Sequence, residues 1–392
     1  MLPVLVVGMI LAASPSYDVS LRSEVRGSNY GQGDGQLNPA LALTVPLGHL
    51  SLLIAYRPRI LLFEPGVSKK ITLFHGVQFS AEQRFSRATR LFVDQQFSYG
   101  ENVFSFLVSG ADLAQPVFDQ TIFDRRAQLP PLLYFSEAAS IGLDQALSRK
   151  VLLSAIASYT FSGGADAAAR VMAPLTRVPR LRLILGWQLG THDSLFTALD
   201  ASADFFSASQ RSYVLDAGVG WRHRFSKDSS LDVAFGISAS RDESTDVIEN
   251  RLYPYVAAGV RRQFIPGTRG TLEGGLNFRL APAFDPISGR VYLRAETLGT
   301  LTYYPTLHLG LITAAGASIA LSGPIQGQKL GFASVSVLYE LNRHLSLSAG
   351  VRGVAQPGIP NLVQSVVVNI PQSGGVSAVG FFAITVSDRG RF

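Results

Sequence analysis

The sequence predicts an all-β fold, a transmembrane antiparallel up-and-down β-barrel of about eighteen strands. Apolar and polar residues alternate with a period of two along most of the chain. The alternating segments run to about nine to fifteen residues, which suits a tilted membrane crossing better than the soluble average of about five or six. Short and long connections alternate between these segments, as they do between the two rims of a barrel.

The segment Gly375 to Phe392 is the most informative part of the chain. It places Phe382, Ile384 and Val386 on one face and small polar side chains on the other, and the polypeptide stops just beyond it. A long final strand at a sheet edge would invite pairing with other chains. In a closed barrel this strand instead pairs with the first one.

The alternation divides the chain into segments that each have one large apolar face and one small, polar or charged face. We expect strands at residues 16–26, 39–46, 49–57, 70–84, 88–99, 131–146, 149–161, 179–190, 193–206, 211–224, 229–240, 251–264, 268–281, 288–303, 305–321, 328–341, 343–355 and 376–388. The longer connections are expected at 27–38, 58–69, 100–130, 162–178, 241–250, 282–287, 322–327 and 356–375. An even strand number places both chain ends at the short-turn rim, which is the periplasmic rim in bacterial outer-membrane barrels.

Composition and the amino terminus agree with an exported membrane protein. The chain has 392 residues, of which 47% are apolar and 16% charged, and no apolar run is long enough for a transmembrane helix. Met1 to Ala13 resembles a secretory signal, although no Lys or Arg precedes its apolar run; a mis-assigned start or a buried first strand is the alternative. We therefore expect a signal peptide at 1–14 and a single barrel at 15–392. The absence of cysteine excludes disulfides and thiolate metal sites.

The sequence offers no pattern for catalysis, for a metal or for nucleic acid. The net charge of +6 is dispersed rather than clustered, so nucleic-acid binding is not expected. The six histidines have no metal-ligand spacing. His192, Asp193 and Ser194 are adjacent in a predicted turn and cannot adopt the geometry of a catalytic triad. We expect neither an enzyme nor a cofactor.

The predicted barrel is too wide to be filled by its own wall. Eighteen strands spaced about 4.8 Å apart and tilted near 40° close at a diameter of roughly 36 Å. Charged residues of both signs fall on the inward face, either as paired wall charges or as the lining of a polar conduit. The candidate lumen-lining residues are Asp18, Arg22, Glu24, Arg182, Asp216, Arg222, Glu273, Arg279, Arg294, Glu296 and Arg352.

The third long loop, residues 100–130, mixes aromatic and charged residues, which is unusual for a disordered segment. It either folds into or caps the barrel, or forms an ordered outer surface. The candidate constriction residues in it are Asp112, Asp119, Asp124, Arg125 and Arg126. In the fourth long loop, residues 164–174 are predicted to form a short helix.

These features resemble the Gram-negative outer-membrane barrel superfamily over the whole mature chain. The resemblance rests on the signal-like start, the alternating strands and the terminal aromatic Phe392, although Asp388 to Arg391 separate that aromatic from the strand's apolar part. It implies an integral outer-membrane location, contact with outer-membrane lipid and insertion by the barrel-assembly machinery.

The layout, together with the phrases YDVSLRSEVRG at 17–27 and GGADAAAR at 163–170, also resembles the stand-alone eighteen-stranded barrels of polysaccharide-export systems. That resemblance implies export of a hydrated glycan, assisted by a separate periplasmic polysaccharide-export protein. Two alternatives stay open: a general diffusion porin, and a structural or enzymatic barrel with a sealed lumen.

Overall fold

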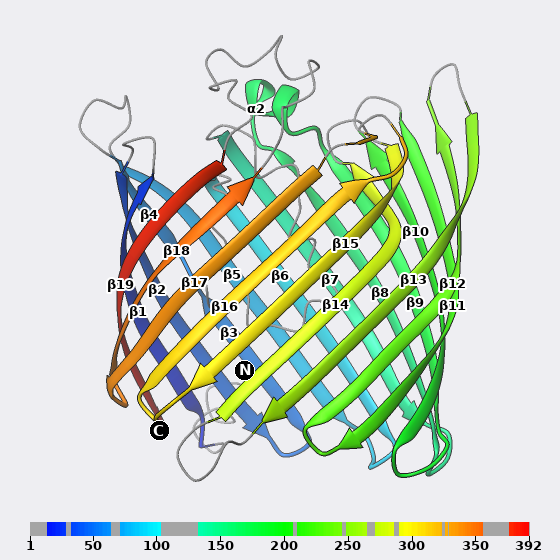
Figure 1. The fold of residues 1–392 in the computed structure, drawn as a ribbon, viewed down its shortest axis with the longest axis horizontal. Coiled ribbons are helices and arrows are strands. Elements are labelled where there is room, and N and C mark those ends of the chain that lie inside the picture. The colour runs from blue at the N-terminus through cyan, green and yellow to red at the C-terminus, as the bar shows by residue number, and fades with distance from the viewer. Residues whose placement is uncertain are drawn as a thin grey trace, which may run out of the picture.

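The structure is a computed structural model that describes residues 14–28, 33–63, 71–102, 132–206, 210–244, 248–264, 271–285, 290–323, 326–327, 329–355 and 376–391. Its strands form one antiparallel sheet that closes on itself as a tilted barrel (Figure 1). In chain order the elements are β1 (Ser16–Ser28), β2 (Gly33–Leu47), β3 (Leu50–Tyr56), β4 (Arg59–Phe63), β5 (Ile71–Arg84), β6 (Thr89–Asn102), β7 (Leu132–Ala146), β8 (Val151–Gly164), α2 (Ala167–Met172), β9 (Thr176–Gln188), β10 (Asp193–Phe206), β11 (Arg211–Ser226), β12 (Ser229–Glu243), β13 (Ile248–Phe264), β14 (Thr271–Asp285), β15 (Arg290–Tyr304), β16 (Leu309–Ala320), β17 (Lys329–Asn342), β18 (Leu345–Ala355) and β19 (Val376–Arg391).

The segments β3 and β4 occupy a single position in the barrel. Both pair with β2 on one side and β5 on the other, in one continuous register. That register places Pro58 opposite Pro39, and neither residue has an N–H to donate. The ladder is interrupted at these prolines and then resumes, so the nineteen segments make eighteen barrel strands, as predicted.

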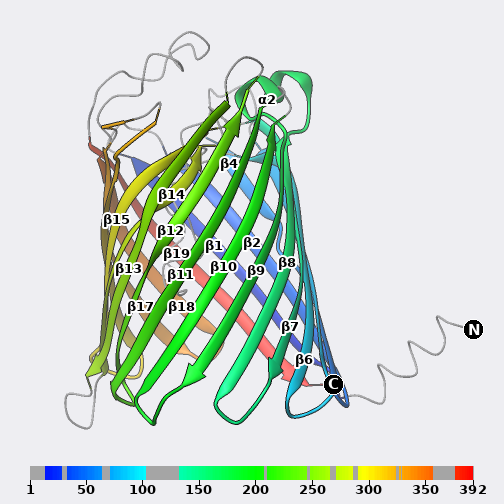
Figure 2. The same ribbon diagram turned by 90° about the vertical axis from the view of Figure 1, so that its right-hand side faces the viewer.

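The barrel closes between its first and last strands (Figure 2). The β1–β19 register runs without interruption from Ser16↔Arg391 to Ser28↔Val379. Closure pairs the backbone groups that would otherwise face hydrocarbon, where each unsatisfied group costs several kcal/mol. The predicted role of the terminal strand is confirmed.

The two faces of each strand differ as the alternation predicted. On β1, Leu21 is 46% exposed, whereas Glu24 on the opposite face is 8% exposed. On β13, Leu252 is 68% exposed and its neighbour Tyr253 only 6%. The exposed large apolar side chains lie on the outside of the cylinder, where they face lipid.

Two predicted strand boundaries are wrong. β2 begins at Gly33 rather than at residue 39, so only 29–32 separate it from β1 instead of the predicted 27–38. Near its start the outward positions include Gly35 and Pro39, which carry no large apolar side chain and weaken the alternation. The inward Gln36 and Asn38 are hydrogen-bonded to each other at 2.5 Å. The predicted loop 58–69 contains β4, which the strand signal missed because Pro58 precedes it.

The arrangement of the rims follows the predicted parity. Tight turns at one rim join β2 to β3, β5 to β6, β7 to β8 and β9 to β10. Because Ser16 pairs with Arg391, the start of β1 and the end of β19 lie at this same rim. The predicted helix in the fourth long connection is confirmed as α2, at the opposite rim (Figure 1). Asp166 caps it, because its Oδ1 accepts the N–H of Ala169 at 2.7 Å. Residues 1–13 lie outside the described residues, so the signal peptide stays a prediction.

Within the described ranges, no helix is both long and apolar enough to cross a membrane.

A charge on the outer face tests the assignment of the two faces. We expect Leu21→Arg, near the middle of β1, to lower the free energy of unfolding by about 2–4 kcal/mol because it places a guanidinium in hydrocarbon. The adjacent Ser20→Arg points into the lumen and is expected to cost much less. Urea unfolding of the barrel in lipid vesicles measures both variants; equal losses would contradict the assignment.

Candidate functional site

Charged side chains on the inner face are joined into ion pairs along and between strands. At the short-turn rim, Arg389 Nε on β19 lies 2.7 Å from Asp18 Oδ2 on β1, so this pair spans the closing seam. Higher on β1, Arg22 Nη2 lies 2.8 Å from Glu24 Oε2. A single solvated pair contributes at most about 1 kcal/mol. Their main consequence is a hydrophilic wall on which both signs of charge lie side by side.

The other predicted lumen residues also lie on the face opposite the exposed apolar side chains. Five of them form ion pairs: Arg182 with Asp200, Arg222 with Asp232, Glu273 with Arg261, and Arg294 with Glu296. The Arg352 guanidinium lies 5.3 Å from the centroid of the Phe332 ring. Asp216 and Arg279 line a cavity at the centre of the wall.

We name five of these side chains the central charged belt: Arg180, Arg182, Asp200, Asp216 and Arg279. Asp200 accepts hydrogen bonds from Arg180 Nε at 2.6 Å and from Arg182 Nε at 2.8 Å. Asp200 and Asp216 are direct cross-strand neighbours, an arrangement that is unfavourable for like charges. Arg180 and Arg182 compensate for it by binding the Asp200 carboxylate directly.

The belt borders a cavity of about 250 Å³ against the inner face of β9 to β14. Phe196 and Tyr255 contribute aromatic surface to it, whereas much of its floor is glycine and alanine. The ring of Phe196 packs directly against Gly220, because a Cβ at Gly220 would lie 2.0 Å from the ring's Cζ. Asp216 Oδ1 and Arg279 Nε have no hydrogen-bond partner within the described part of the chain. The cavity therefore combines an apolar surface with charged side chains.

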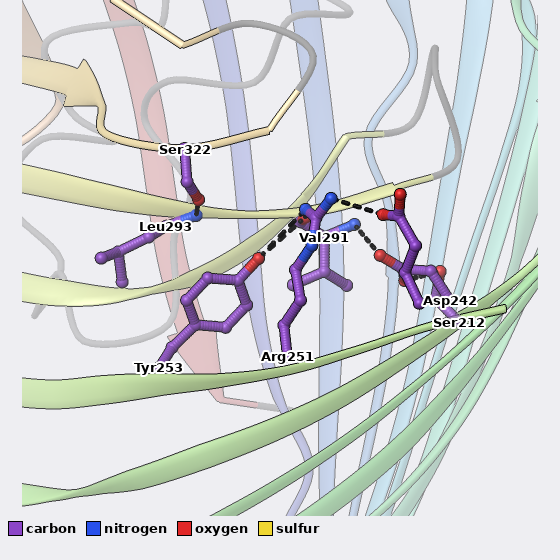
Figure 3. Close-up of polar contacts among 8 residues, drawn as sticks. Ser212, Asp242, Arg251, Tyr253, Val291, Leu293 and Ser322 are labelled. Atoms are coloured by element: carbon purple, nitrogen blue, oxygen red, sulfur yellow. Dashed lines mark hydrogen bonds and ion pairs between the residues drawn. The ribbon is translucent and has the colours of Figure 1, made fainter.

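Near the long-loop rim, the ends of β14 and β15 leave the wall and fold over the lumen. We call this segment, Ala281–Asp285 with Arg290–Leu293, the inward hairpin. Asp242 Oδ2 on β12 accepts the N–H of Val291 at 3.4 Å (Figure 3). Tyr253 Oη and Arg251 Nη1 on β13 each donate to the Val291 carbonyl at 3.4 Å. Val291 is only 1% exposed, so the inward hairpin is packed against the wall.

Two prolines explain why the inward hairpin separates from β13. Pairing between β13 and β14 runs from Phe264↔Leu272 to Val256↔Leu280 and ends there. Two residues further, the same register would place Pro254 opposite Pro282, and neither can donate a ladder hydrogen bond. Over the remaining described residues, Ile248–Tyr255 and Ala281–Asp285 do not pair with each other.

The predicted constriction residues Asp112, Asp119, Asp124, Arg125 and Arg126 lie outside the described residues. The inward hairpin was not predicted. Its contacts join β12, β13 and β15, which are far apart in the sequence, and the alternation of side chains carries no information about such contacts. Arg180 was also missed, although it has the same parity as Arg182 on β9. Among the described residues, no group of three His, Cys, Asp or Glu side chains could hold a metal ion.

With the barrel and its lining described, comparison with known proteins assigns a family. A family model described as the EpsX exopolysaccharide export family matches residues 12–368. The chain belongs to the EpsX exopolysaccharide export family. No curated protein matches this EpsX-family chain in sequence.

Solved structures share the fold of this EpsX-family barrel at low sequence identity. The outer membrane protein opdK from Pseudomonas aeruginosa is 11% identical with a TM-score of 0.51, over 96% of this chain and 99% of its own. The FrpB iron transporter from Neisseria meningitidis (F3-3 variant) is 10% identical with a TM-score of 0.52, over 89% of this chain and 63% of its own. The ferric-catecholate import receptor Fiu from K12 E. coli is 8% identical with a TM-score of 0.51, over 94% and 82%. The EpsX-family chain thus spans less than two thirds of FrpB.

Together, the family and the fold identify an integral outer-membrane barrel that serves exopolysaccharide export. This confirms the predicted fold, location and class of function. The family and the fold are those of a transport barrel rather than of an enzyme.

Removing one contact of the inward hairpin should widen the outer mouth. Asp242→Ala deletes the acceptor for the Val291 N–H and for Ser212 Oγ, which donates to Oδ1 at 2.6 Å. Loss of such bonds costs about 1–3 kcal/mol, so the inward hairpin should leave the wall more often. We expect larger and noisier single-channel conductance in planar bilayers. Glu243→Ala, next in sequence but on the outer face, is the control; identical traces from the two variants would argue against this role for Asp242.

Proposed function

We propose that a hydrated exopolysaccharide chain leaves the cell through this lumen and makes its closest wall contacts at the central charged belt. The observation that carries the proposal is the match to the EpsX family over residues 12–368, in a closed barrel whose inner face is polar. A glycan chain in water needs a wide, wettable path, and a barrel of roughly 36 Å backbone diameter provides one.

The chemistry of the belt suits a hydroxyl-rich ligand. Carboxylates accept and guanidiniums donate, so Asp200, Asp216 and Arg279 can together serve both halves of a sugar hydroxyl. Phe196 and Tyr255 offer flat apolar surfaces beside them, against which the C–H faces of a sugar ring can pack. Because charges of both signs are paired, the wall favours a neutral or weakly charged chain over a strongly charged one.

The two rims would then play different parts. The inward hairpin lies across the outer mouth and would bound the path there. At the opposite rim the tight turns form a compact edge, which is where a separate periplasmic polysaccharide-export protein would dock. The further candidate lumen residues, Glu273 and Arg222 among them, would keep the lower lumen wet.

Belt variants in a complemented deletion strain test the proposal. We expect deletion of the gene to abolish the surface exopolysaccharide. Asp216→Asn combined with Arg279→Gln should restore it poorly, at unchanged barrel abundance. In bilayers, oligosaccharides of the same glycan should block this double variant about tenfold more weakly, because a hydrogen bond to a charged group contributes about 1.5–3 kcal/mol.

The matched control is Glu82→Gln with Arg84→Gln, an inner-face ion pair on β5 at the short-turn rim. This control should export normally. An intact surface glycan in the deletion strain, with steady uptake of small sugars, would favour a diffusion porin. A purified barrel that carries no current would favour a sealed lumen.

A further inference from the structure

A groove of about 920 Å³ crosses the wall of the barrel on β8 to β13. It is centred on one row of inward-pointing residues that pair across the strands, Arg180, Ser202, Val214, Ser240 and Arg251. Its flanks are the outward-pointing residues immediately before and after each of them. The groove therefore lies on the outer face of the barrel, separate from the lumen.

Large and small side chains alternate to form this groove. Leu181, Leu215 and Leu252, all strongly exposed, stand along one side. Alanines lower the surface between them, with Ala201 and Ala239 in the same outward row. Outward residues on one strand repeat every two positions, about 6.6 Å apart. A groove bounded by two such rows is about as wide as one extended hydrocarbon chain.

Arginines lie along the flank of the groove that is nearer the long-loop rim. Arg241 contributes to its flank, directly opposite Tyr213 in the β11–β12 register. In the next outward row, Arg177 and Arg211 are both opposite Phe205. Arg177 is held at 5.3 Å from the centroid of the Phe161 ring.

The local charge is positive. Glu243, also outward, forms an ion pair with Arg241 at 2.7 Å and is opposite Arg211 in the register. Arg211 and Arg241 therefore share one carboxylate, and Arg177 adds a third positive charge in the same outward row as Arg211. Tyr159, which is 40% exposed, lies opposite Pro179 on the same flank of the groove. Exposed aromatic residues mark a membrane interface, and arginine binds phosphate there in bidentate geometry.

We propose that the groove binds an acyl chain of a phosphorylated lipid of the outer leaflet, with Arg177, Arg211 and Arg241 holding its phosphate. An apolar channel at the depth of the hydrocarbon and a cationic row at the depth of the headgroups match the two ends of such a molecule. The hollow is about one chain wide, which fits a single acyl chain. The site is independent of the glycan path.

Lipid binding by the purified full-length barrel tests this site. The probes are diphosphoryl lipid A and the same lipid with both phosphates removed, measured by native mass spectrometry and by thermal stability in detergent. We expect the wild-type protein to retain the phosphorylated lipid and to melt at a higher temperature with it. Arg177→Gln, Arg211→Gln and Arg241→Gln combined should weaken its binding at least about tenfold and leave the dephosphorylated lipid unaffected, since only the phosphate contacts are lost.

A second variant addresses the apolar half of the site. Ala239→Leu fills the groove and should weaken the binding of both lipids. Ala317→Leu, on the exposed outer face of β16, should weaken the binding of neither. Heat-modifiable migration on gels checks that each variant is folded. The proposal is overturned if wild-type protein binds the two lipids equally, or if Ala317→Leu reduces binding as much as Ala239→Leu.

Discussion

Backbone hydrogen bonding in a medium without water is the constraint on which this molecule depends. A sheet can cross hydrocarbon only if no edge is left unpaired, and the antiparallel seam between β1 and β19 meets that condition over the full length of β1. Once the ring is closed, the period-two alternation of side chains gives an apolar outside and a polar inside. The lumen, its charges and the groove on the outer face all follow from that separation.

Inside the closed barrel, the main physical constraint is the width of the lumen. Eighteen strands enclose more space than inward side chains can fill, so charges remain near water and are stabilised by their neighbours. Asp200 and Asp216 are adjacent, and two arginines on β9 bind Asp200 directly. Such a wall is wettable without a strong field of one sign, which is a property that a passage for a glycan needs.

The sequence predicted what depends on local periodicity and missed what depends on distant contacts. Strand number and facing followed from the alternation, and α2 lies within the short helix predicted at residues 164–174. The start of β2 was missed because Gly35 and Pro39 interrupt the outward row of large apolar side chains, while pairing with β1 still extends the strand. The inward hairpin depends on Asp242 reaching Val291, two residues 49 positions apart, and no short window contains both. The sequence shows that residues 254 and 282 are prolines. Only the β13–β14 register shows that they would lie opposite each other.

The prolines at positions 254 and 282 have a mechanical consequence. In the middle of the barrel every strand is hydrogen-bonded to both neighbours. The circumference there cannot change unless one of these ladders breaks. Above the last β13–β14 pair, Val256 with Leu280, this hydrogen bonding is interrupted on one side. Near the long-loop rim the barrel can therefore widen where β13 and β14 share no ladder hydrogen bonds. The middle of the barrel keeps a fixed diameter.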